Sequence, residues 1–264
     1  MRSAILRFVV LVKYAPDTQL DRQIDPSTRR VDRAESILSE LDEYPIEAAL
    51  TLSETLGGSK AGHEVIALTM GPEKAVNAVK KALQIGADKG VHLCAEELQG
   101  ADATMTAAAL AAAIEAIGGA DVVLTAMSST DGQTSLLPPA LAATMGLPVL
   151  TEAIELSMPD DQHIQIVRDE DGMLLTIQSQ LPAVVSVTDR ANEPRYPGFK
   201  QIIAAKRKKV ETLGLNDVSI KQQQVPVTVS MAEPRPERGA GEIFHDEQAG
   251  IAAVLKVLEK EQLL

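Results

Sequence analysis

Short apolar runs alternate with segments of helical spacing along this sequence, and that alternation limits the possible folds more than any other feature. Continuous apolar runs are typical of strands covered on both faces. The expected strands are 8–13, 63–71, 90–95, 121–127 and 180–189, and the expected helical segments are 39–58, 72–88, 103–119 and 136–146. Strands that alternate with helices pair in parallel through right-handed crossovers. We therefore predict an α/β fold, a doubly wound and mostly parallel Rossmann-like sheet.

The pattern changes in the second half of the chain. Residues 163–178 predict two strands around a turn at Asp171-Gly172, so a β-hairpin is added to the fold. The stretch 222–246 is rich in proline, glutamine, glycine and charge, which is typical of an extended arm. Residues 247–264 have an amphipathic helical pattern. Such a C-terminal arm buries little by itself, so we expect a partner to accept it; docking on the same chain is the alternative.

Charge and composition exclude several functions. A formal net charge of −12 repels nucleic acid and acidic membranes. Aromatic residues make up 2% of the chain, so bases have almost nothing to stack on. The single cysteine, Cys94, permits no internal disulfide and no cysteine-rich metal site. The first apolar run ends at Lys13 and is too short to span a membrane. We expect a cytoplasmic protein with no metal, no nucleic acid partner and no membrane insertion.

Two expected turns are candidates for ligand contact. The turn Thr69–Ala75 lies where a strand ends and a helix begins, so free N–H groups point outward there, although by itself it is more typical of a plain connection. The loop Ser128–Ser135 carries five hydroxyls, one carboxylate and a glycine, which suits a ribose and a phosphate. A polar lead-in to a capped helix explains this loop equally well. No G-x-G-x-x-G follows the first strand and no G-x-x-x-x-G-K-[ST] occurs, so ordinary dinucleotide and P-loop sites are not predicted.

The remaining polar residues form no catalytic constellation. The four histidines are scattered and no H-E-x-x-H occurs, so we predict that the chain is not an enzyme. The acidic run Asp169–Asp171 is typical of a solvated turn. The basic run Lys206–Lys209 indicates either a phosphate or lipid patch or, more commonly, a solvated helix end.

Several segments nevertheless resemble one known family, the β subunits of electron transfer flavoproteins, and in particular the actinobacterial members. The resemblance extends from Phe8 to about Gly241. It is carried by the turn TMGPEKA, by ALQIGADKGVHL, by LPAVVSVTDRANEPRYPGFKQIIAAKRKK and by the later R-G-A-G. The block 181–209 is the most specific part, because it places N-E-P-R-Y between an apolar strand and a basic helix.

The resemblance implies an adenine-nucleotide α-hydrolase-like fold and a role in electron transport. A family β subunit pairs with an α subunit that holds the redox FAD, and most β subunits bury an AMP. The heterodimer carries single electrons from acyl-CoA and related dehydrogenases, as in fatty acid β-oxidation, to a quinone oxidoreductase. By the same resemblance, residues 1–190 are the nucleotide-binding domain, 191–212 the partner-recognition loop and basic helix, and 213–264 the arm that docks on the α subunit.

The resemblance also implies roles for individual residues. Ser39 stands where Asn is common, and Ser135-Leu136-Leu137 replaces a more polar run, so side-chain contacts to the nucleotide differ from the family pattern. The residues implied for AMP are Leu11, Ser39, Met70, Gly71, Asp131, Gly132, Gln133, Thr134 and Ser135, and those near the flavin are Thr18 and Leu41.

Two further residues are implied for partner contacts. Phe199 stands where the family carries an apolar anchor for the partner dehydrogenase, and Pro197-Gly198 predicts a turn that presents it. Asp169 replaces a more usual glutamate that pairs with an arginine of the α subunit.

Three alternatives remain at this stage. A homodimer of the universal-stress type would bind an adenine nucleotide without redox work, but it leaves block 181–209 unexplained. An enzyme that uses an adenylated intermediate needs a glycine-rich loop after the first strand, where this chain has Tyr14-Ala15-Pro16-Asp17. A bifurcating flavoprotein subunit would hold a second FAD in place of AMP.

Overall fold

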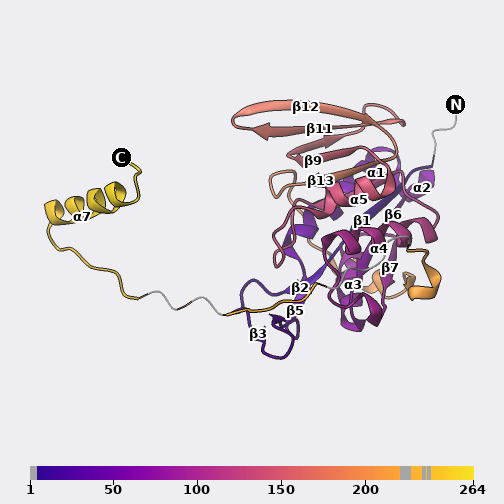
Figure 1. Cartoon of the computed structure of the whole chain (residues 1–264). Coiled ribbons are helices and arrows are strands. Elements are labelled where there is room, and N and C mark those ends of the chain that lie inside the picture. The colour runs from indigo at the N-terminus through magenta and orange to yellow at the C-terminus, as the bar shows by residue number, and fades with distance from the viewer. Residues whose placement is uncertain (1–4, 221–226, 234–235, 237–238) are drawn as a thin grey trace. The chain divides into compact units, whose positions relative to one another are not determined.

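The computed structural model describes residues 5–220, 227–233, 236 and 239–264. The chain forms two compact units, Met1–Met231 and Ala232–Leu264 (Figure 1). The seven-stranded sheet lies in the first unit, and the last helix lies in the second. Two of the expected segments, 1–190 and 213–264, include positions outside the described residues.

The first unit is built on one parallel sheet, which confirms the predicted doubly wound α/β fold (Figure 1). Every strand pairs in parallel with its neighbours. Along the sheet the strands are β14 (Val210–Leu213), β7 (Lys89–Leu93), β6 (Glu64–Met70), β1 (Arg7–Leu11), β8 (Val122–Ala126), β13 (Ala183–Val187) and β9 (Val149–Ala153). Strand β8 is buried along its whole length, as its continuous apolar run predicts.

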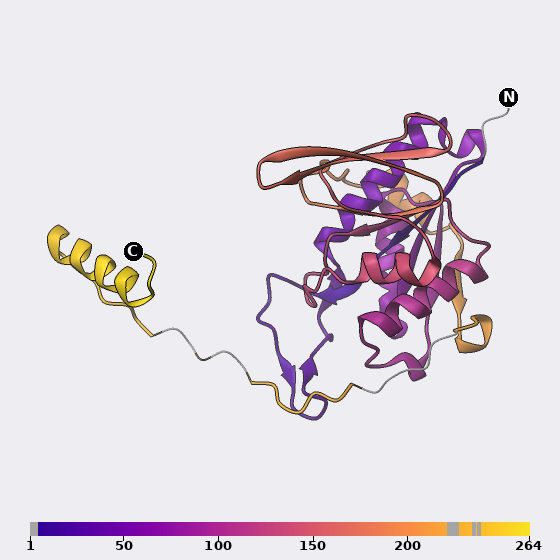
Figure 2. The same ribbon diagram turned by 45° about the horizontal axis from the view of Figure 1, so that its top comes forward.

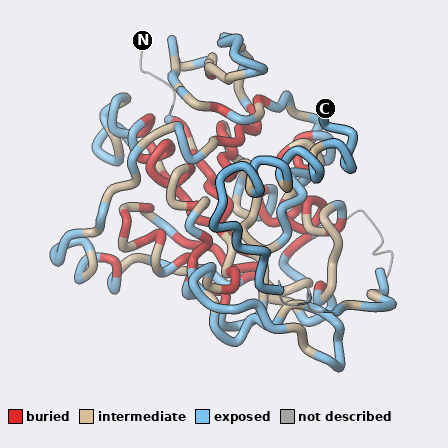
Figure 3. The backbone as a smooth tube through the Cα atoms, turned by 90° about the vertical axis from the view of Figure 1, so that its left-hand side faces the viewer, coloured by how far each residue is buried: buried red, intermediate tan, exposed pale blue. Residues whose placement is uncertain are grey.

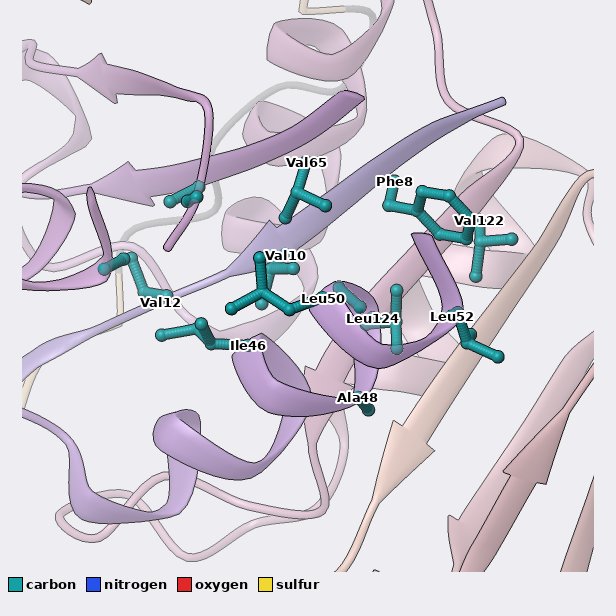
Figure 4. Packing of buried hydrophobic residues seen from close by; sticks show 14 of the residues in the cluster. Phe8, Val10, Val12, Ile46, Ala48, Leu50, Leu52, Val65, Val122 and Leu124 are labelled. Carbon is teal, nitrogen blue, oxygen red and sulfur yellow. The ribbon is translucent and has the colours of Figure 1, made fainter. Parts of the chain in front are cut away.

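The two faces of the sheet are covered by different helices. Side chains alternate along β1, so Phe8 and Val10 join one apolar cluster while Val9 and Leu11 join the other. Helices α1 (Glu43–Thr55) and α3 (Val76–Ile85) pack on the first face, and α4 (Ala103–Ala116) and α5 (Leu137–Met145) pack on the second. Figure 4 shows Ile46 and Leu50 of α1 beside Val10 of β1, and Figure 3 shows the buried segments inside the unit.

A separate antiparallel sheet covers part of the first face. It consists of β10 (Glu155–Ser157), β11 (His163–Glu170) and β12 (Met173–Gln180), which are paired in that order. The β11–β12 turn falls at Asp171-Gly172, where both residues have positive φ, so the predicted hairpin is confirmed. Ile164 and Ile166 of β11 are buried in the same cluster as α1, which fixes this sheet against the core.

The polar stretch 17–33 that follows β1 has no periodicity, which predicts a loop or a short hairpin, and the structure has a short hairpin there. Residues 14–38 contain β2 (Tyr14–Pro16), β3 (Ile24–Asp25), β4 (Arg30–Val31) and β5 (Ser36–Leu38). Strand β2 pairs with β5, and β3 with β4, both antiparallel. We call residues 17–35 the excursion. Arg29 and Arg30 in it donate to backbone carbonyls of residues 227–230, which run alongside it in Figure 2.

The smaller elements complete the first unit. They are the helices α2 (Gly58–Ala61) and α6 (Phe199–Ala205) and the 3-10 turns η1 (Glu40–Asp42), η2 (Glu73–Ala75), η3 (Glu96–Leu98) and η4 (Leu215–Asp217). Segment 191–213 is joined to the body of the unit, since β14 within it pairs with β7.

The basic run Lys206–Lys209 includes a helix cap. Lys208 Nζ donates to the carbonyl oxygens of Leu83, Gly86 and Ala87, at 3.1, 3.0 and 2.7 Å. These carbonyls lie at the carboxyl end of α3 and have no partner within the helix, so the ammonium satisfies them and opposes the helix dipole. Burial lowers the pKa of Lys208, and the nearby Asp88 opposes that effect.

Replacing Lys208 with methionine is expected to reduce the free energy of unfolding by about 2 kcal/mol, because the carbonyls at the end of α3 lose their donor. Lys206→Met is the matched control: Lys206 is exposed, and we expect a change below about 0.5 kcal/mol. Urea unfolding of both variants measures the difference. Equal effects would show that the cap contributes nothing.

The second unit contains α7 (Glu247–Lys260), whose first turn is capped by Asp246, which accepts a hydrogen bond from Ala249 N–H at 2.8 Å. Residues 239–244 before it form neither helix nor strand. The helix has no buried residue (Figure 3). Its apolar side chains Ile251, Val254, Leu255 and Val257 are exposed. Among the described residues, none of the helices is both long and apolar enough to cross a membrane.

Candidate functional site

The sheet topology places a switch point at the carboxyl end of β1, and we call this edge of the sheet the crevice. From β1 the chain moves to β6 and β7 on one side, and it then crosses to β8 on the other side. The connections after β1 and β8 therefore diverge, and in open α/β sheets ligands bind at this switch point. Residues 12–13, 71–72 and 127–136 follow β1, β6 and β8 at this edge.

Charged side chains connect two of these loops. Lys13 Nζ lies 2.8 Å from Asp131 Oδ1 and 3.4 Å from Ser129 Oγ. Arg33 of the excursion pairs with the other oxygen of Asp131 at 2.5 Å. The Asp131 side chain is only 3% exposed, and burial raises its pKa, but the two cations outweigh burial and hold the pKa well below its usual range. Asp131 is thus ionised and pairs with two cations. The three side chains together carry a net positive charge in an acidic protein.

A second carboxylate lies beneath this group. Asp42 Oδ2 accepts the backbone N–H of Lys13 at 2.7 Å, and Asp42 is buried. Burial raises the pKa of Asp42 to about 7; hydrogen bonding and charge from Lys13 oppose the rise, and Asp131 adds to it. Two carboxyl groups with very different acidity therefore lie beside one lysine.

Three hydroxyl oxygens near this edge are buried without a hydrogen-bond partner among the described residues. They belong to Ser39 before η1, Thr69 near the end of β6 and Thr130 after β8. Buried polar atoms are nearly always paired, so these three hydroxyls have an unused bonding capacity that a ligand group could satisfy. A nucleotide supplies ribose hydroxyls, ring nitrogens and phosphate oxygens, so the hydroxyls present fit such a ligand.

The loop after β8 is held in an unusual conformation. Gly132 N–H donates to Asp131 Oδ1 at 2.8 Å and to Ser129 Oγ at 3.1 Å, and Arg22 donates to the Thr130 carbonyl. Gln133 and Ser135 have positive φ, at 49° and 51°, which costs free energy for residues with a Cβ. Strain of this kind persists where surrounding contacts fix it, which is common at ligand-binding loops.

The loop after β6 is fixed by β7. Gly71 N–H donates to the Leu93 carbonyl at 3.1 Å, and the Gly71 carbonyl lies 3.0 Å from Nε2 of the buried His92. A cavity of about 270 Å³ lies next to this loop, lined by Tyr14, Arg33, Pro72, Glu73 and Lys74.

The residues expected at the site lie in several elements of the first unit. Leu11, Ser39, Met70 and Gly71 lie at the carboxyl ends of β1 and β6 or before η1, and Asp131, Gly132, Gln133, Thr134 and Ser135 form the loop after β8. Thr18 Oγ1 donates to the Glu40 carboxylate at 3.0 Å, and Leu41 follows Glu40 in η1. Phe199 begins α6, and Asp169 lies on β11, where its carboxylate bonds Gly172 N–H and Arg190.

Four residues of the crevice were not expected: Lys13, Arg22, Arg33 and Asp42. Lys13 carried a signal, because it is the charge that ends the first apolar run, at the edge where ligands gather. Asp42 lies inside the expected helical segment, and the two arginines lie in a stretch without periodicity, so their meeting depends on the excursion. No group of three potential metal ligands occurs in the described part of the chain.

A parallel sheet with a polar crevice at its switch point defines the class of doubly wound α/β proteins that bind ligands there. Comparison with known families narrows the class. The family model for the electron transfer flavoprotein domain matches residues 30–218. The chain belongs to this family, which confirms the resemblance noted in its sequence.

Curated relatives match over nearly the whole chain. Electron transfer flavoprotein subunit beta of Mycobacterium tuberculosis is 36% identical over 97% of this chain and 98% of its own length. The subunit beta of Mycobacterium leprae has the same identity and coverage. A caffeyl-CoA reductase-Etf complex subunit of Acetobacterium woodii is 31% identical, over 90% of this chain and 92% of its own length. The two mycobacterial relatives are named as electron transfer flavoprotein subunits, which are electron carriers, and this agrees with the expectation that the chain is not an enzyme. The third is named as a subunit of a complex of a reductase with Etf.

Proposed function

We propose that this chain is the β subunit of a heterodimeric electron transfer flavoprotein that works in the cytoplasm. It pairs with an α subunit that holds FAD, and the heterodimer carries single electrons from acyl-CoA and related dehydrogenases to a quinone oxidoreductase. Family membership supports the carrier role. The observation that carries the nucleotide site is the arrangement at the switch point: Lys13 and Arg33 pair with Asp131 there, and three hydroxyls near the same edge are buried without a partner among the described residues.

AMP is the ligand that we assign to this crevice. The backbone at Leu11, Met70 and Gly71 lies at the carboxyl ends of β1 and β6, where ligands of open α/β sheets bind, and we assign the base to this place. The hydroxyls of Ser39 and Thr130 have unused bonding capacity for ribose or phosphate oxygens. Lys13 and Arg33 supply the positive charge that a phosphate needs, and Asp131 holds both in place.

FAD supplies the reversible electron-accepting ring when the heterodimer is assembled, and this chain contributes only contacts to it. We assign these contacts to Thr18, which bonds the Glu40 side chain, and to Leu41, which follows Glu40 in η1. The exposed apolar face of α7 is the part that we assign to docking on the α subunit, because it has no buried residue of its own. Phe199 is the proposed anchor for the donor dehydrogenase, and Asp169 the proposed contact to the α subunit.

Counting cofactors tests the assignment directly. The chain is co-expressed with its α subunit, the purified complex is denatured, and the released flavin and AMP are measured by chromatography. We expect one FAD and one AMP per heterodimer. Two flavins and no AMP would replace the simple carrier with a bifurcating subunit. A stable flavin-free homodimer would contradict the proposal and favour a protein of universal-stress type.

Replacing Thr130 with valine tests the crevice itself. The change removes one unpaired hydroxyl and keeps the shape of the side chain, so AMP is expected to bind the nucleotide-free heterodimer about tenfold more weakly. Without AMP the same variant gains up to about 1 kcal/mol of stability, because a buried unpaired oxygen is gone. Calorimetric titration with AMP measures the affinity. Thr144→Val, whose hydroxyl bonds the Ala140 carbonyl within α5, is the control with unchanged affinity.

A further inference from the structure

The motif N-E-P-R has a role that neither the crevice nor the carrier assignment explains. It lies between β13 and α6, and it leads directly into two exposed aromatic side chains. Tyr196 is 95% exposed and Phe199 is 78% exposed. Large apolar side chains left in water on a structured segment indicate a contact surface. We call residues 196–199 the aromatic loop.

Arg195 fastens the start of the aromatic loop to helix α1. Its Nε and Nη2 donate to the two carboxylate oxygens of Glu47, at 2.7 and 2.8 Å. Its Nη1 and Nη2 donate to the carboxylate of Glu54, at 2.6 and 3.0 Å. The Arg195 backbone N–H also donates to Glu47, at 3.2 Å. Glu47 and Glu54 are seven residues apart and share one face of α1, so a single planar guanidinium reaches both.

We call the contact of Arg195 with Glu47 and Glu54 the clamp, and its side chains are charged at neutral pH. Glu47 is almost fully buried, and burial raises its pKa, but the hydrogen bonds from Arg195 outweigh burial and hold the pKa below its ordinary value. A buried carboxylate that has lost its arginine would be costly, so the two residues enforce one arrangement. Asn192 Nδ2 donates to the Tyr44 carbonyl at 3.0 Å, which ties the segment to α1 one turn earlier.

The other end of the aromatic loop is fixed as well. Gly198 N–H donates to Gln201 Oε1 at 2.7 Å at the start of α6. Pro197 restricts its own backbone torsion between these two fixed points. A loop held in one conformation loses less entropy on binding than a free loop does, so its contacts convert more fully into affinity.

We propose that Arg195 is a positioning residue that holds the aromatic loop in the conformation a donor dehydrogenase binds. This inference rests on the proposed function, in which Phe199 is the anchor. Helix α1 begins directly after Asp42 at the crevice and carries Glu47 and Glu54 farther along. One rigid helix therefore sets the position of the aromatic loop relative to the crevice.

In the experiment an acyl-CoA dehydrogenase and its acyl-CoA substrate reduce the assembled heterodimer. The concentration of the heterodimer is varied, so that KM and kcat for this electron acceptor are measured. Phe199→Ala is expected to raise KM for the heterodimer about thirtyfold, as loss of an anchor does. Arg195→Lys keeps the charge but loses the planar set of donors that reaches both glutamates. It is expected to raise KM about tenfold with kcat and flavin content unchanged. Lys60→Arg is the control: Lys60 lies in α2, outside the partner-recognition segment, is exposed and makes no side-chain hydrogen bond within the described residues, so we expect no change in KM.

Combining the variants separates positioning from stability. If Arg195 acts only through the aromatic loop, Arg195→Lys adds nothing to KM in a Phe199→Ala background. Glu54→Gln weakens one arm of the clamp at an exposed carboxylate, and a threefold rise in KM, about half of the tenfold effect on a logarithmic scale, is expected even if Arg195→Lys folds poorly. If the effects of Arg195→Lys and Phe199→Ala on KM multiply in the double variant, the positioning role is wrong. It is also wrong if Arg195→Lys and Glu54→Gln leave KM unchanged while Phe199→Ala raises it. Either outcome leaves the anchor role of Phe199 intact. An unchanged Phe199→Ala would overturn both the anchor and this inference.

Discussion

Replacing Gly90 with alanine is expected to reduce the free energy of unfolding by about 3 kcal/mol, the upper end of the usual loss when atoms are added to a well-packed core. Gly90 lies in β7, between β6 and β14, under helix α3. A Cβ at this position would collide with Cγ1 of Val79 and would lie 3.4 Å from Cγ2 of Val210. Val79 is fully buried and has a short branched side chain, so it cannot move aside.

A second substitution identifies the cause. Val79→Ala alone is expected to cost about 2 kcal/mol through the cavity it leaves. The double variant Gly90→Ala/Val79→Ala is expected to unfold close to Val79→Ala alone, because the alanine methyl then occupies vacated space. Gly214→Ala is the control, since the nearest atom to its added Cβ lies 3.6 Å away. Urea unfolding of the four variants measures these differences, and additive losses in the double variant would rule out the Val79 collision as the reason.

The sequence predicts the interior of the sheet well for a physical reason. Strands β1, β6, β8 and β13 are covered on both faces, so each is a continuous apolar run that stands out from its surroundings. The β11–β12 hairpin is equally clear, because Asp171-Gly172 supplies the positive φ that its turn requires.

The two strands of the main sheet that were missed are its edges. Strands β14 and β9 end the strand order, and each has exposed positions mixed with buried ones. Their sequences, VETL and VLTEA, are short and partly polar, so no local pattern separates them from loops. They are strands because β7 and β13 offer them backbone partners, and that information lies far away in the chain.

The candidate site also contains residues that the sequence predicts and residues that it does not. Residues at the carboxyl ends of β1, β6 and β8 could be expected at one edge, because parallel strands bring their ends together. The ion pairs of Asp131 could not be expected, because Arg33 reaches Asp131 only through the folding of the excursion. The unpaired hydroxyls of Ser39 and Thr130 are likewise a property of packing, since both residue types usually bond nearby backbone.

Asp42 makes the stability of this protein fall as pH rises. Its pKa is 3.8 in an unfolded chain and about 7 in the folded one, so the folded state binds the extra proton between these values. The contribution of Asp42 is fully present below pH 3.8 and is lost as pH rises through about 7. A difference of this size corresponds to about 4 kcal/mol.

Replacing Asp42 with asparagine removes this dependence, because the amide is neutral at every pH and its oxygen still accepts the Lys13 N–H. The difference in unfolding free energy between variant and wild type is expected to be small at pH 4 and to reach about 3 kcal/mol in favour of the variant at pH 8. Denaturant unfolding at several pH values measures it. Asp160→Asn is a control of opposite sign, since hydrogen bonds from Gln162 and His163 lower the pKa of Asp160.

The direction in which this stability difference changes with pH shows whether Asp42 is neutral or ionised in the folded protein at neutral pH. If Asp42 were ionised and stabilised by Lys13 at neutral pH, Asp42→Asn would lose stability at pH 8, and the difference would run the other way. When Asp42 is neutral, the Lys13 ammonium pairs with Asp131 alone, and no second negative charge lies near the place proposed for the phosphate. Raising the pH through 7 then adds that charge, so AMP affinity is expected to fall in the wild-type heterodimer more steeply than in the Asp42→Asn heterodimer.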